Sequence, residues 1–192
     1  MRYPPEHKEQ ARTRIVEAAG RAFRRNGYGS VGVDGLAKEA GVTSGAFYGH
    51  FRSKDSAFRE VAVRGLEELR VGIADLQAAH GAGWIAPFVD FYIGERRTCE
   101  LGESCALQSL TPDVMRADAD TRSAYEEAFE QVVDQVVQGL AHLAPGLARQ
   151  RALGLLALLS GGVTMARSMA SEKSSTAIGD AVRAAARDLV AA

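Results

Sequence analysis

The stretch VDGLAKEAGVTSGAFYGHF, residues 33–51, decides the fold of the N-terminal part of this chain. Leu36, Ala37 and Ala40 lie on one face at helical spacing, which predicts a short amphipathic helix. Gly41 follows directly, and glycine adopts the left-handed backbone conformation that commonly ends a helix at little cost. The first half of the stretch therefore predicts a short helix that ends in a tight turn.

A second short helix is expected after this turn. A side-chain oxygen of Thr43 or Ser44 can cap its first turn. Phe47 and Phe51 are four residues apart, so they share a face and can be buried together, whereas Tyr48 points elsewhere. Two short helices with glycine, cap and aromatic residues at these offsets indicate a helix-turn-helix, the motif that places a helix in the major groove of DNA. The alternative is a plain helical hairpin with two packed phenylalanines.

Residues 8–60 resemble the N-terminal domain of the TetR family of bacterial transcriptional regulators. The resemblance is carried by Ile15–Phe23, Asn26–Tyr28, Val33–Ala37, Ala40–Thr43, Gly45–Phe51, Lys54, Asp55 and Phe58. It implies a homodimeric transcription factor, most often a repressor, that a small-molecule effector releases from a double-stranded DNA operator. The remainder of the chain is similar to the family only in length and helical character.

Hydrophobic periodicity along the whole chain predicts an all-α fold of about nine helices and no strands. We expect a three-helix helix-turn-helix head over residues 1–53 and a helical ligand-binding and dimerisation body over residues 54–192. The head helices are expected at about 8–25, 33–40 and 44–50. The body helices are expected at about 54–80, 84–97, 120–142, 148–169 and 175–190, with a shorter, irregular segment at 98–120.

Composition and charge agree with this division. The 192 residues are 46% hydrophobic and 24% charged, which is typical of a globular protein. Residues 1–60 hold 11 Lys and Arg against 7 Asp and Glu, a net charge of +4, whereas residues 61–192 hold 12 against 17, a net charge of −5. A basic head on an acidic body suits contact with phosphates at one end only. We expect a cytoplasmic protein, because no signal peptide or membrane-length apolar segment is found in the sequence.

By the resemblance, residues at the start of the third helix face DNA bases or the adjacent backbone. These are Thr43, Ser44, Gly45 and Ala46. Tyr48, His50 and Lys54 match positions that contact phosphates or the groove edge. Helix N-termini add backbone N–H donors to the same anions.

Three features depart from the family pattern in the head. Gly49 stands where a large polar or aromatic residue is frequent, and Ser44 stands where lysine is frequent. Val31 and Gly32 replace a threonine/serine pair, which removes a phosphate-contacting hydroxyl and a good helix cap. Further contacts are expected from basic residues before and on the first helix, with a solvated helix face as the equal alternative. These are Arg2, Lys8 and Arg12.

The resemblance also places an effector cavity inside the body. Its expected lining residues are Trp84, Phe88, Phe91, Tyr92, Cys105, Leu107, Met115, Tyr125 and Phe129, with Met165 and Met169 closing the dimer side. They predict an apolar or aromatic effector. An aromatic stripe at helical spacing is more often part of an ordinary core, and for each of these residues taken singly the core is the favoured interpretation.

The last two helices form the predicted dimer surface. Residues 152–163 are apolar nearly all round, and Gly154, Gly161 and Gly162 permit close approach of another helix. The residues expected in the interface are Leu153, Leu156, Gly161, Met165, Ile178, Val182, Ala185 and Leu189. The alternative is that these helices only cover the core of their own chain.

The two cysteines leave one further hypothesis open. Cys99 and Cys105 are six residues apart with no histidine nearby, a spacing that does not fit a zinc site, and no metal or cofactor is predicted. A thiol sensor of electrophiles or oxidants on the same fold is possible by the resemblance, with Arg96 and Arg97 as groups that lower a thiol pKa. We expect Cys105 to be the more reactive. The alternative is two unreactive cysteines packed as small apolar residues.

Two other functional classes find little support. Residues 27–32 match G-x-G-x-x-G, but this segment follows a helix rather than a strand, so the dinucleotide-binding interpretation fails. No nucleophile–base arrangement favours an enzyme, and we predict that the chain is not one. A helical adaptor that binds protein instead of DNA is the remaining alternative.

Overall fold

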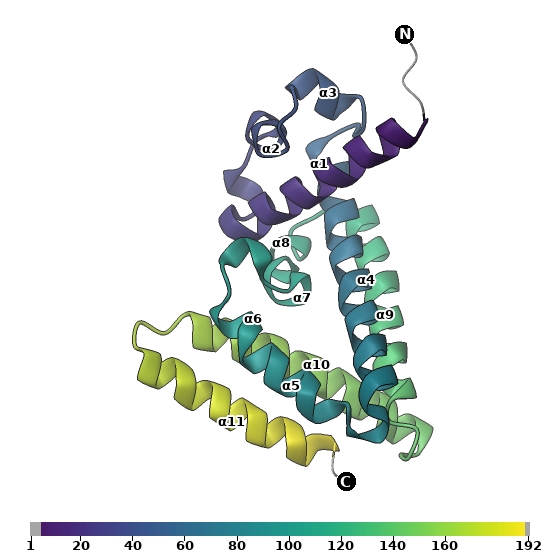
Figure 1. Cartoon of the computed structure of the whole chain (residues 1–192), viewed down its shortest axis with the longest axis vertical. Helices are drawn as coiled ribbons and strands as arrows, with labels where there is room; N and C mark the ends of the chain where they lie inside the picture. The colour runs from purple at the N-terminus through teal and green to yellow at the C-terminus, as the bar shows by residue number, and fades with distance from the viewer. Residues whose placement is uncertain (1–4, 191–192) are drawn as a thin grey trace.

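The computed structural model describes residues 5–190, and within them the predicted all-α class is confirmed, because every regular element is a helix. Figure 1 shows the N-terminal helices as a head at one end, long antiparallel helices in the middle, and a layer of helices at the other end. The head comprises α1 (Pro5–Asn26), η1 (Tyr28–Ser30), α2 (Val33–Glu39) and α3 (Ser44–Tyr48). The body comprises α4 (Lys54–His80), η2 (Gly81–Gly83), α5 (Ile85–Ile93), α6 (Glu95–Thr98), η3 (Leu101–Glu103), α7 (Ala106–Ser109), α8 (Thr111–Val114), α9 (Ala119–Gln138), α10 (Pro145–Arg167) and α11 (Glu172–Val190).

The long helix α4 joins the head to the body. The Ser53 hydroxyl accepts a hydrogen bond from the Ser56 backbone N–H, and the Ser56 hydroxyl accepts one from the Ser53 N–H, both at 3.1 Å. This reciprocal capping box fixes the point where α4 begins. The helix then packs side by side with α9 along most of its length (Figure 1).

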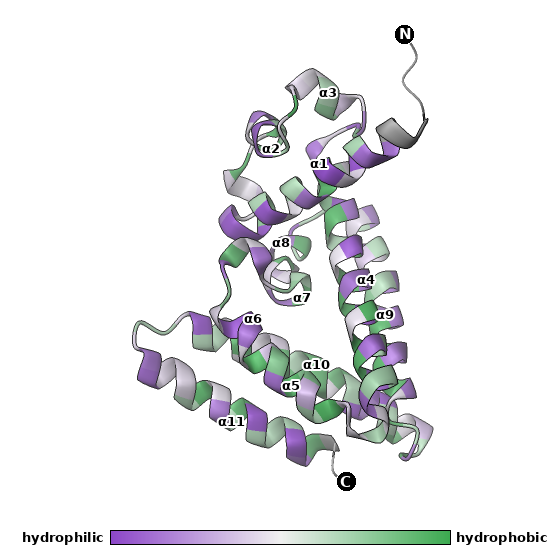
Figure 2. Cartoon of the chain, viewed as in Figure 1, coloured by the Kyte–Doolittle hydropathy of each residue, from purple (hydrophilic) through white to green (hydrophobic). Residues whose placement is uncertain are grey.

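Two hydrophobic cores divide the molecule. The head core is built around phenyl rings from α1, α3 and α4, and its largest members are Ile15, Phe23, Leu36, Phe47, Phe51 and Phe58. The same core includes Ala106, Leu110 and Val114, which lie in α7, between α7 and α8, and in α8. Residues of the body therefore pack directly against the head helices. The body core lies among α4, α5, α9, α10 and α11, and Figure 2 shows hydrophobic residues along α5 and α10.

The expected fifth helix is divided. It breaks at Gly94, whose φ of −80° and ψ of −87° are not helical, into α5 and the short α6. A Cβ atom at this position would lie 2.7 Å from the carbonyl oxygen of Asp90, so only glycine fits the break as it stands.

The last two helices pack closely against each other through glycine. A Cβ at Gly162 of α10 would lie 2.5 Å from a methyl group of Val182 on α11, and one at Gly154 would lie 3.2 Å from Leu189. The predicted role of these two glycines in close helix approach is therefore confirmed, and the two helices that approach each other are α10 and α11 of the same chain. At Gly161 an added Cβ meets no atom within 4 Å.

Candidate DNA-binding head and adjoining cavity

The turn between α2 and α3 is closed by backbone hydrogen bonds. Gly41 has a φ of 67°, and its N–H donates to the carbonyl of Lys38 at 3.1 Å. The N–H of Val42 donates to the carbonyl of Ala37 at 2.9 Å. This pair of bonds is a Schellman motif, so the predicted left-handed glycine at the end of the first short helix is confirmed.

The start of α3 is fixed by side chains. Of the two predicted caps, the structure selects Thr43, whose hydroxyl accepts a hydrogen bond from the Ala46 N–H at 3.2 Å. The Ser44 hydroxyl instead donates to the Asp34 carboxylate on α2. Ser44 is therefore engaged inside the motif. At the start of α2, Gly32 provides no side-chain cap, as its replacement of a hydroxyl residue predicted.

The two aromatic faces of α3 separate as expected. Phe47 is 0% exposed and Phe51 is 3% exposed, with their ring centroids 5.4 Å apart. The neighbouring Tyr48 is 57% exposed. Because Phe47 is buried and Tyr48 is exposed, the face of α3 that carries Tyr48 is the one that faces solvent. Most of the residues predicted to contact DNA lie on that face. Thr43, Gly45, Ala46 and Tyr48 are exposed on it, and Ser44 and His50 are partly exposed.

Arg12 is a partly exposed residue of α1 that links three parts of the head and the start of the body. Its guanidinium bonds the Glu60 carboxylate, donates to the His50 carbonyl at 2.8 Å and lies 4.6 Å from the centre of the Phe51 ring. These contacts tie α1 to α4 and to the residues that follow α3, so Arg12 is not simply a solvated cation, and its contact with DNA stays a prediction. Arg2 lies outside the described residues, as does the side chain of Lys8.

Lys54 sits at the beginning of α4 beside the loop that follows α1. Its ammonium group lies 3.9 Å from the centre of the Tyr28 ring, while the Tyr28 hydroxyl donates to Asp55. Partial burial, followed by the interaction with Asp55, raises the pKa of Tyr28 to about 12. The phenol therefore stays protonated at neutral pH, and the stacked ring positions the Lys54 cation at the edge of the head.

One further exposed cation on this side was missed from the sequence. Arg52 lies between α3 and α4, is exposed, and has no ion-pair partner among residues 5–190. Its place directly after Phe51, at the end of the aromatic cluster, was the available signal.

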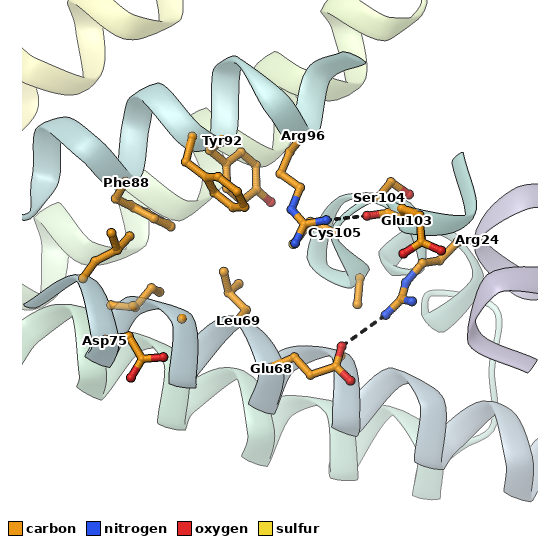
Figure 3. Close-up of a pocket in the computed structure, with 16 residues that line it drawn as sticks. Arg24, Glu68, Leu69, Asp75, Phe88, Tyr92, Arg96, Glu103, Ser104 and Cys105 are labelled. Carbon is orange, nitrogen blue, oxygen red and sulfur yellow. Dashed lines mark hydrogen bonds and ion pairs between the residues drawn. The ribbon is translucent and has the colours of Figure 1, made fainter. Parts of the chain in front are cut away.

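A cavity of about 430 Å³ lies where the head meets the body. One wall is formed by α4, the opposite wall by α5 and α6, and one end by α1, η3 and the start of α7 (Figure 3). Its apolar surface comes mainly from Leu69, Ile73, Leu76, Phe88, Phe91 and Tyr92. Its charged groups are Arg24, Glu68, Asp75, Arg96 and Glu103.

Four of the predicted lining residues do line this cavity: Phe88, Phe91, Tyr92 and Cys105. Five predicted lining residues lie elsewhere, and each has a physical reason in its packing. Trp84 is 0% exposed and its indole N–H donates to the Gly139 carbonyl at 3.0 Å, while Leu107 and the partly buried Phe129 pack in the body core.

Tyr125 and Met115 complete these corrections. The Tyr125 hydroxyl is 2.6 Å from the Thr111 hydroxyl, so this side chain is engaged between α8 and α9. Met115 is 66% exposed at the end of α8. The two methionines expected to close the dimer side, Met165 and Met169, are 59% and 39% exposed and do not border the cavity.

The two cysteines have different surroundings. Cys105 borders the cavity beside Tyr92, at the residue before α7. Cys99 lies outside the cavity, where the guanidinium of Arg167 is 3.6 Å from its sulfur and donates to its carbonyl at 2.8 Å. The cation that contacts a thiol is therefore Arg167, and the thiol is that of Cys99. Arg96, one of the two arginines predicted near the thiols, lines the same cavity as Cys105.

The predicted dimer residues divide into two groups. Leu156 is 1% exposed and Val182 is 8% exposed, because both pack inside the core of their own chain, and they are removed from the predicted surface. Ile178 and Leu189 are partly buried against the same core. The residues that face outward are Leu153, Gly161, Met165 and Ala185.

A helix-turn-helix with an outward-facing second helix, joined to a helical body with a cavity, is the architecture of a DNA-binding regulator. The profile of bacterial regulatory proteins of the tetR family matches residues 15–61. YfiR of Bacillus subtilis, an uncharacterized HTH-type transcriptional regulator, is 33% identical over 44% of this chain and 42% of its own length. The HTH-type transcriptional repressor Rv1474c of Mycobacterium tuberculosis is 28% identical over 82% of this chain and 95% of its own length.

The solved structures agree with these sequence matches. Reduced NemR of E. coli superposes with a TM-score of 0.79 at 19% identity, covering 94% of this chain and 98% of that protein. At this identity the superposition shows the shared fold. Residues 15–61 therefore belong to the DNA-binding domain of the tetR family of bacterial regulatory proteins, and the chain as a whole is similar to regulators of this family in sequence and fold.

Two other kinds of site are absent from residues 5–190. No group of three or more histidine, cysteine, aspartate or glutamate side chains is arranged to hold a metal ion there. In the same residues no helix combines the length and the apolar character needed to cross a membrane.

Proposed function

We propose that this chain is a DNA-binding transcriptional regulator that acts as a homodimer, represses from an operator, and is released when a small effector binds the body. The observation that carries the proposal is the outward face of α3. Phe47 and Phe51 anchor this helix in a closed core, so the exposed Thr43, Gly45 and Tyr48 are presented on a rigid support.

The chemistry of that face suits DNA. Small residues at the start of α3 allow the helix backbone to approach the floor of a major groove. Tyr48 offers a hydroxyl at the groove edge, while Lys54 and Arg52 bring cations toward flanking phosphates. Few side chains are placed to read bases, because Gly45 and Ala46 carry no donors. Much of the affinity is then expected from phosphate contacts, which makes it sensitive to salt.

An exposed stripe on α10 supports dimerisation. Leu153, Ala157, Gly161 and Met165 follow one another at four-residue spacing and all face outward. The exposed residues Ala181 and Ala185 of the adjacent helix α11 are small, so a second copy can approach closely. Two heads in one dimer are expected to read successive major grooves about 34–36 Å apart.

A substitution on this stripe tests the dimer. We expect Met165→Glu to convert the protein from dimer to monomer in analytical ultracentrifugation, because a charge would be buried without a partner. Gln131→Glu, on an exposed position of α9 and so outside the two helices of the proposed surface, is the control and should leave the dimer intact. A wild-type protein that sediments as a monomer at micromolar concentration would contradict the proposed assembly.

The DNA-contact assignment is tested by the double variant Tyr48→Ala, Lys54→Ala. We expect weaker operator binding, and a salt dependence that is flatter by about one phosphate contact, because one cation and one hydroxyl leave the interface. The matched control is Lys173→Ala, which removes an exposed lysine from the body and should change neither quantity. Unchanged binding by the double variant would count against the assigned contacts.

A second candidate function is a thiol sensor of electrophiles on the same fold. The observation that favours it is the position of Cys105 on the cavity wall beside Tyr92. We expect limiting iodoacetamide to label Cys105 before Cys99 in the native protein, as read by peptide mass spectrometry. Failure of Cys105 to react in the folded protein would remove this candidate, and the regulator proposal would stand without it.

A further inference from the structure

The cavity has two chemically different ends. Figure 3 shows Arg24, Arg96 and Glu103 gathered at one end, and Asp75 and Phe88 toward the other. Glu68 and Asp75 are two turns apart on α4, which corresponds to about 10 Å along the helix axis. Between them the surface is apolar, formed by Leu69 and its neighbours on α4 and by the aromatic side chains of α5. A molecule that fills the cavity is therefore elongated, with an apolar middle.

Two buried polar atoms at the cavity have no hydrogen-bond partner among residues 5–190. They are the hydroxyl of Tyr92 and the Nε of Arg24. Tyr92 is 1% exposed, and in Figure 3 its hydroxyl points toward the Arg96 side chain. Burial, followed by electrostatic and hydrogen-bonding interaction with the Cys105 thiol, raises the pKa of Tyr92 well above its usual value, so the phenol is protonated and can donate. The thiol is only a weak acceptor, and it makes no hydrogen bond of normal distance and angle with this hydroxyl. Buried donors without acceptors are costly unless something else completes them.

The two arginines at this end have N–H groups that are available to donate hydrogen bonds. The side chain of Arg24 is 14% exposed, and its Nη2 is 3.7 Å from Glu68, beyond hydrogen-bond distance. Glu68 instead accepts a hydrogen bond from Arg64 at 3.3 Å. Arg96 donates to the carbonyl of Glu103 and lies 5.0 Å from the centre of the Phe91 ring, with no carboxylate within ion-pair distance among the described residues. Guanidinium groups donate only, so the group that completes them must be an acceptor.

We propose that the cavity binds an organic carboxylate with a flat apolar body about 10 Å long. Its carboxylate accepts hydrogen bonds from Arg24, Arg96 and the Tyr92 hydroxyl, and its apolar body lies between α4 and α5. The opposite orientation is disfavoured, because both cations that line the cavity, Arg24 and Arg96, lie at this end, where they offset Glu68 and Glu103, whereas Asp75 at the other end has no lining cation beside it. This inference rests on the proposed function, since it names the chemical class of the effector.

The same contact links the effector to the DNA-binding head. Arg24 belongs to α1, which also supplies Ile15 and Phe23 to the head core, whereas Glu68 belongs to α4. A bound carboxylate takes over the Arg24 donors and so removes the α1–α4 ion pair at this point. The contacts between α1 and α4 then differ between the free and bound states, and such a difference allows the effector to favour a state with weaker DNA binding.

Isothermal calorimetry with three probes of one shape tests the inference. They are 2-naphthoate, its neutral amide 2-naphthamide, and the cation 2-naphthylmethylammonium. We expect 2-naphthoate to bind at least about tenfold more tightly than either other probe, because charge-assisted hydrogen bonds are the strong ones. Equal binding of the three, preference for the cation, or no naphthoate binding at millimolar concentration would overturn the proposal.

Variants assign the effect to Arg24. Arg24→Met should reduce naphthoate affinity about tenfold or more while leaving naphthamide unchanged, and Arg24→Lys should restore part of the preference. Arg21→Met is the matched control, because Arg21 lies one turn before Arg24 on α1 and pairs with Glu39 of α2, but does not border the cavity. If the folded Arg24→Lys and Arg24→Met proteins both bound naphthoate with wild-type affinity, Arg24 would not be a ligand of the carboxylate.

Two readouts separate this inference from the proposed function. Calorimetry needs no DNA, so the preference for a carboxylate can be read even if the chain binds no operator. Operator binding measured by fluorescence anisotropy needs no probe, so it can succeed while the carboxylate preference fails. If both hold, 2-naphthoate should weaken operator binding by the wild type and leave the Arg24→Met complex unaffected at the same concentration.

Discussion

The cores of the head and of the body differ in how completely they are closed. In the head, Phe23 lies 5.3 Å from Phe58, and Phe47 lies 5.4 Å from Phe51, measured between ring centroids, with all four rings no more than 3% exposed. In the body, the Phe88–Tyr92 aromatic pair is equally buried, yet it borders a cavity of about 430 Å³.

This difference matches two tasks. A closed core resists deformation, and so it holds the outward face of α3 at a fixed angle to the rest of the head. A core with an open cavity contains polar atoms without hydrogen-bond partners. It can adopt a second packing when a ligand supplies those partners. The junction between them is the end of α1, where Arg24 and Arg25 pair with Glu68 and Glu100 of the body.

The largest effect is expected at the closed core. Phe47→Ala should lower the free energy of unfolding by about 3–5 kcal/mol, because it leaves a void among packed rings. Tyr48→Ala, at the next position but exposed, should change it by less than about 0.5 kcal/mol. Chemical denaturation followed by circular dichroism measures both. Similar losses in the two variants would mean that the head core is not closed in this way.

Two glycines on α4 sharpen the contrast between closed and open packing. A Cβ at Gly65 would lie 2.3 Å from the Cβ of Ala106, so Gly65→Ala should destabilise the protein by about 1–3 kcal/mol. Gly72, seven residues later, also borders the cavity, but a Cβ there meets nothing within 4 Å. Gly72→Ala should therefore stabilise the protein by up to about 1 kcal/mol through helix propensity. Thermal melts of both variants decide this, and destabilisation by Gly72→Ala would contradict an open cavity.

The smallest effect concerns pH and the edge of the head. The pKa of Tyr28 is raised from its ordinary value of 10 to about 12 in the folded protein. Its contribution to stability is therefore fully present below about pH 10 and is lost as the pH rises to about 12. The stability difference between wild type and Tyr28→Phe should shrink over this range in urea titrations. A difference that stays constant or grows would contradict the raised pKa.

The head could be predicted closely because its signals are local. The turn at Gly41, the cap at Thr43 and the burial of Phe47 all depend on residues within one or two helical turns. The cap at Ser53 and the start of α4 follow from the same kind of short-range pattern. The engagement of Arg12 with Glu60 joins residues 48 positions apart, and no local pattern indicated it.

The cavity could be predicted only in part, because its wall is made where distant elements meet. Trp84 and Phe88 share an aromatic stripe and pack with ring centroids 5.6 Å apart. The carbonyl of Gly139, directly after α9, accepts a hydrogen bond from the Trp84 indole N–H, and only Phe88 borders the cavity. Arg24 was missed because α1 belongs to the head by sequence, although its last turns also border the body. The division of the fifth helix at Gly94 likewise depends on its packing in the fold.

Fluorescence anisotropy with DNA tests the central claim most directly. Purified protein would be titrated, over a salt series, with labelled DNA from just upstream of its own coding region and with DNA selected by the protein from a random pool. We predict tight, sequence-dependent binding. The logarithm of the association constant should fall steeply and linearly with the logarithm of salt concentration, because phosphate contacts dominate. Absence of salt-sensitive binding to either DNA, before and after removal of any co-purified ligand, would contradict the DNA-binding role and favour a protein-binding adaptor.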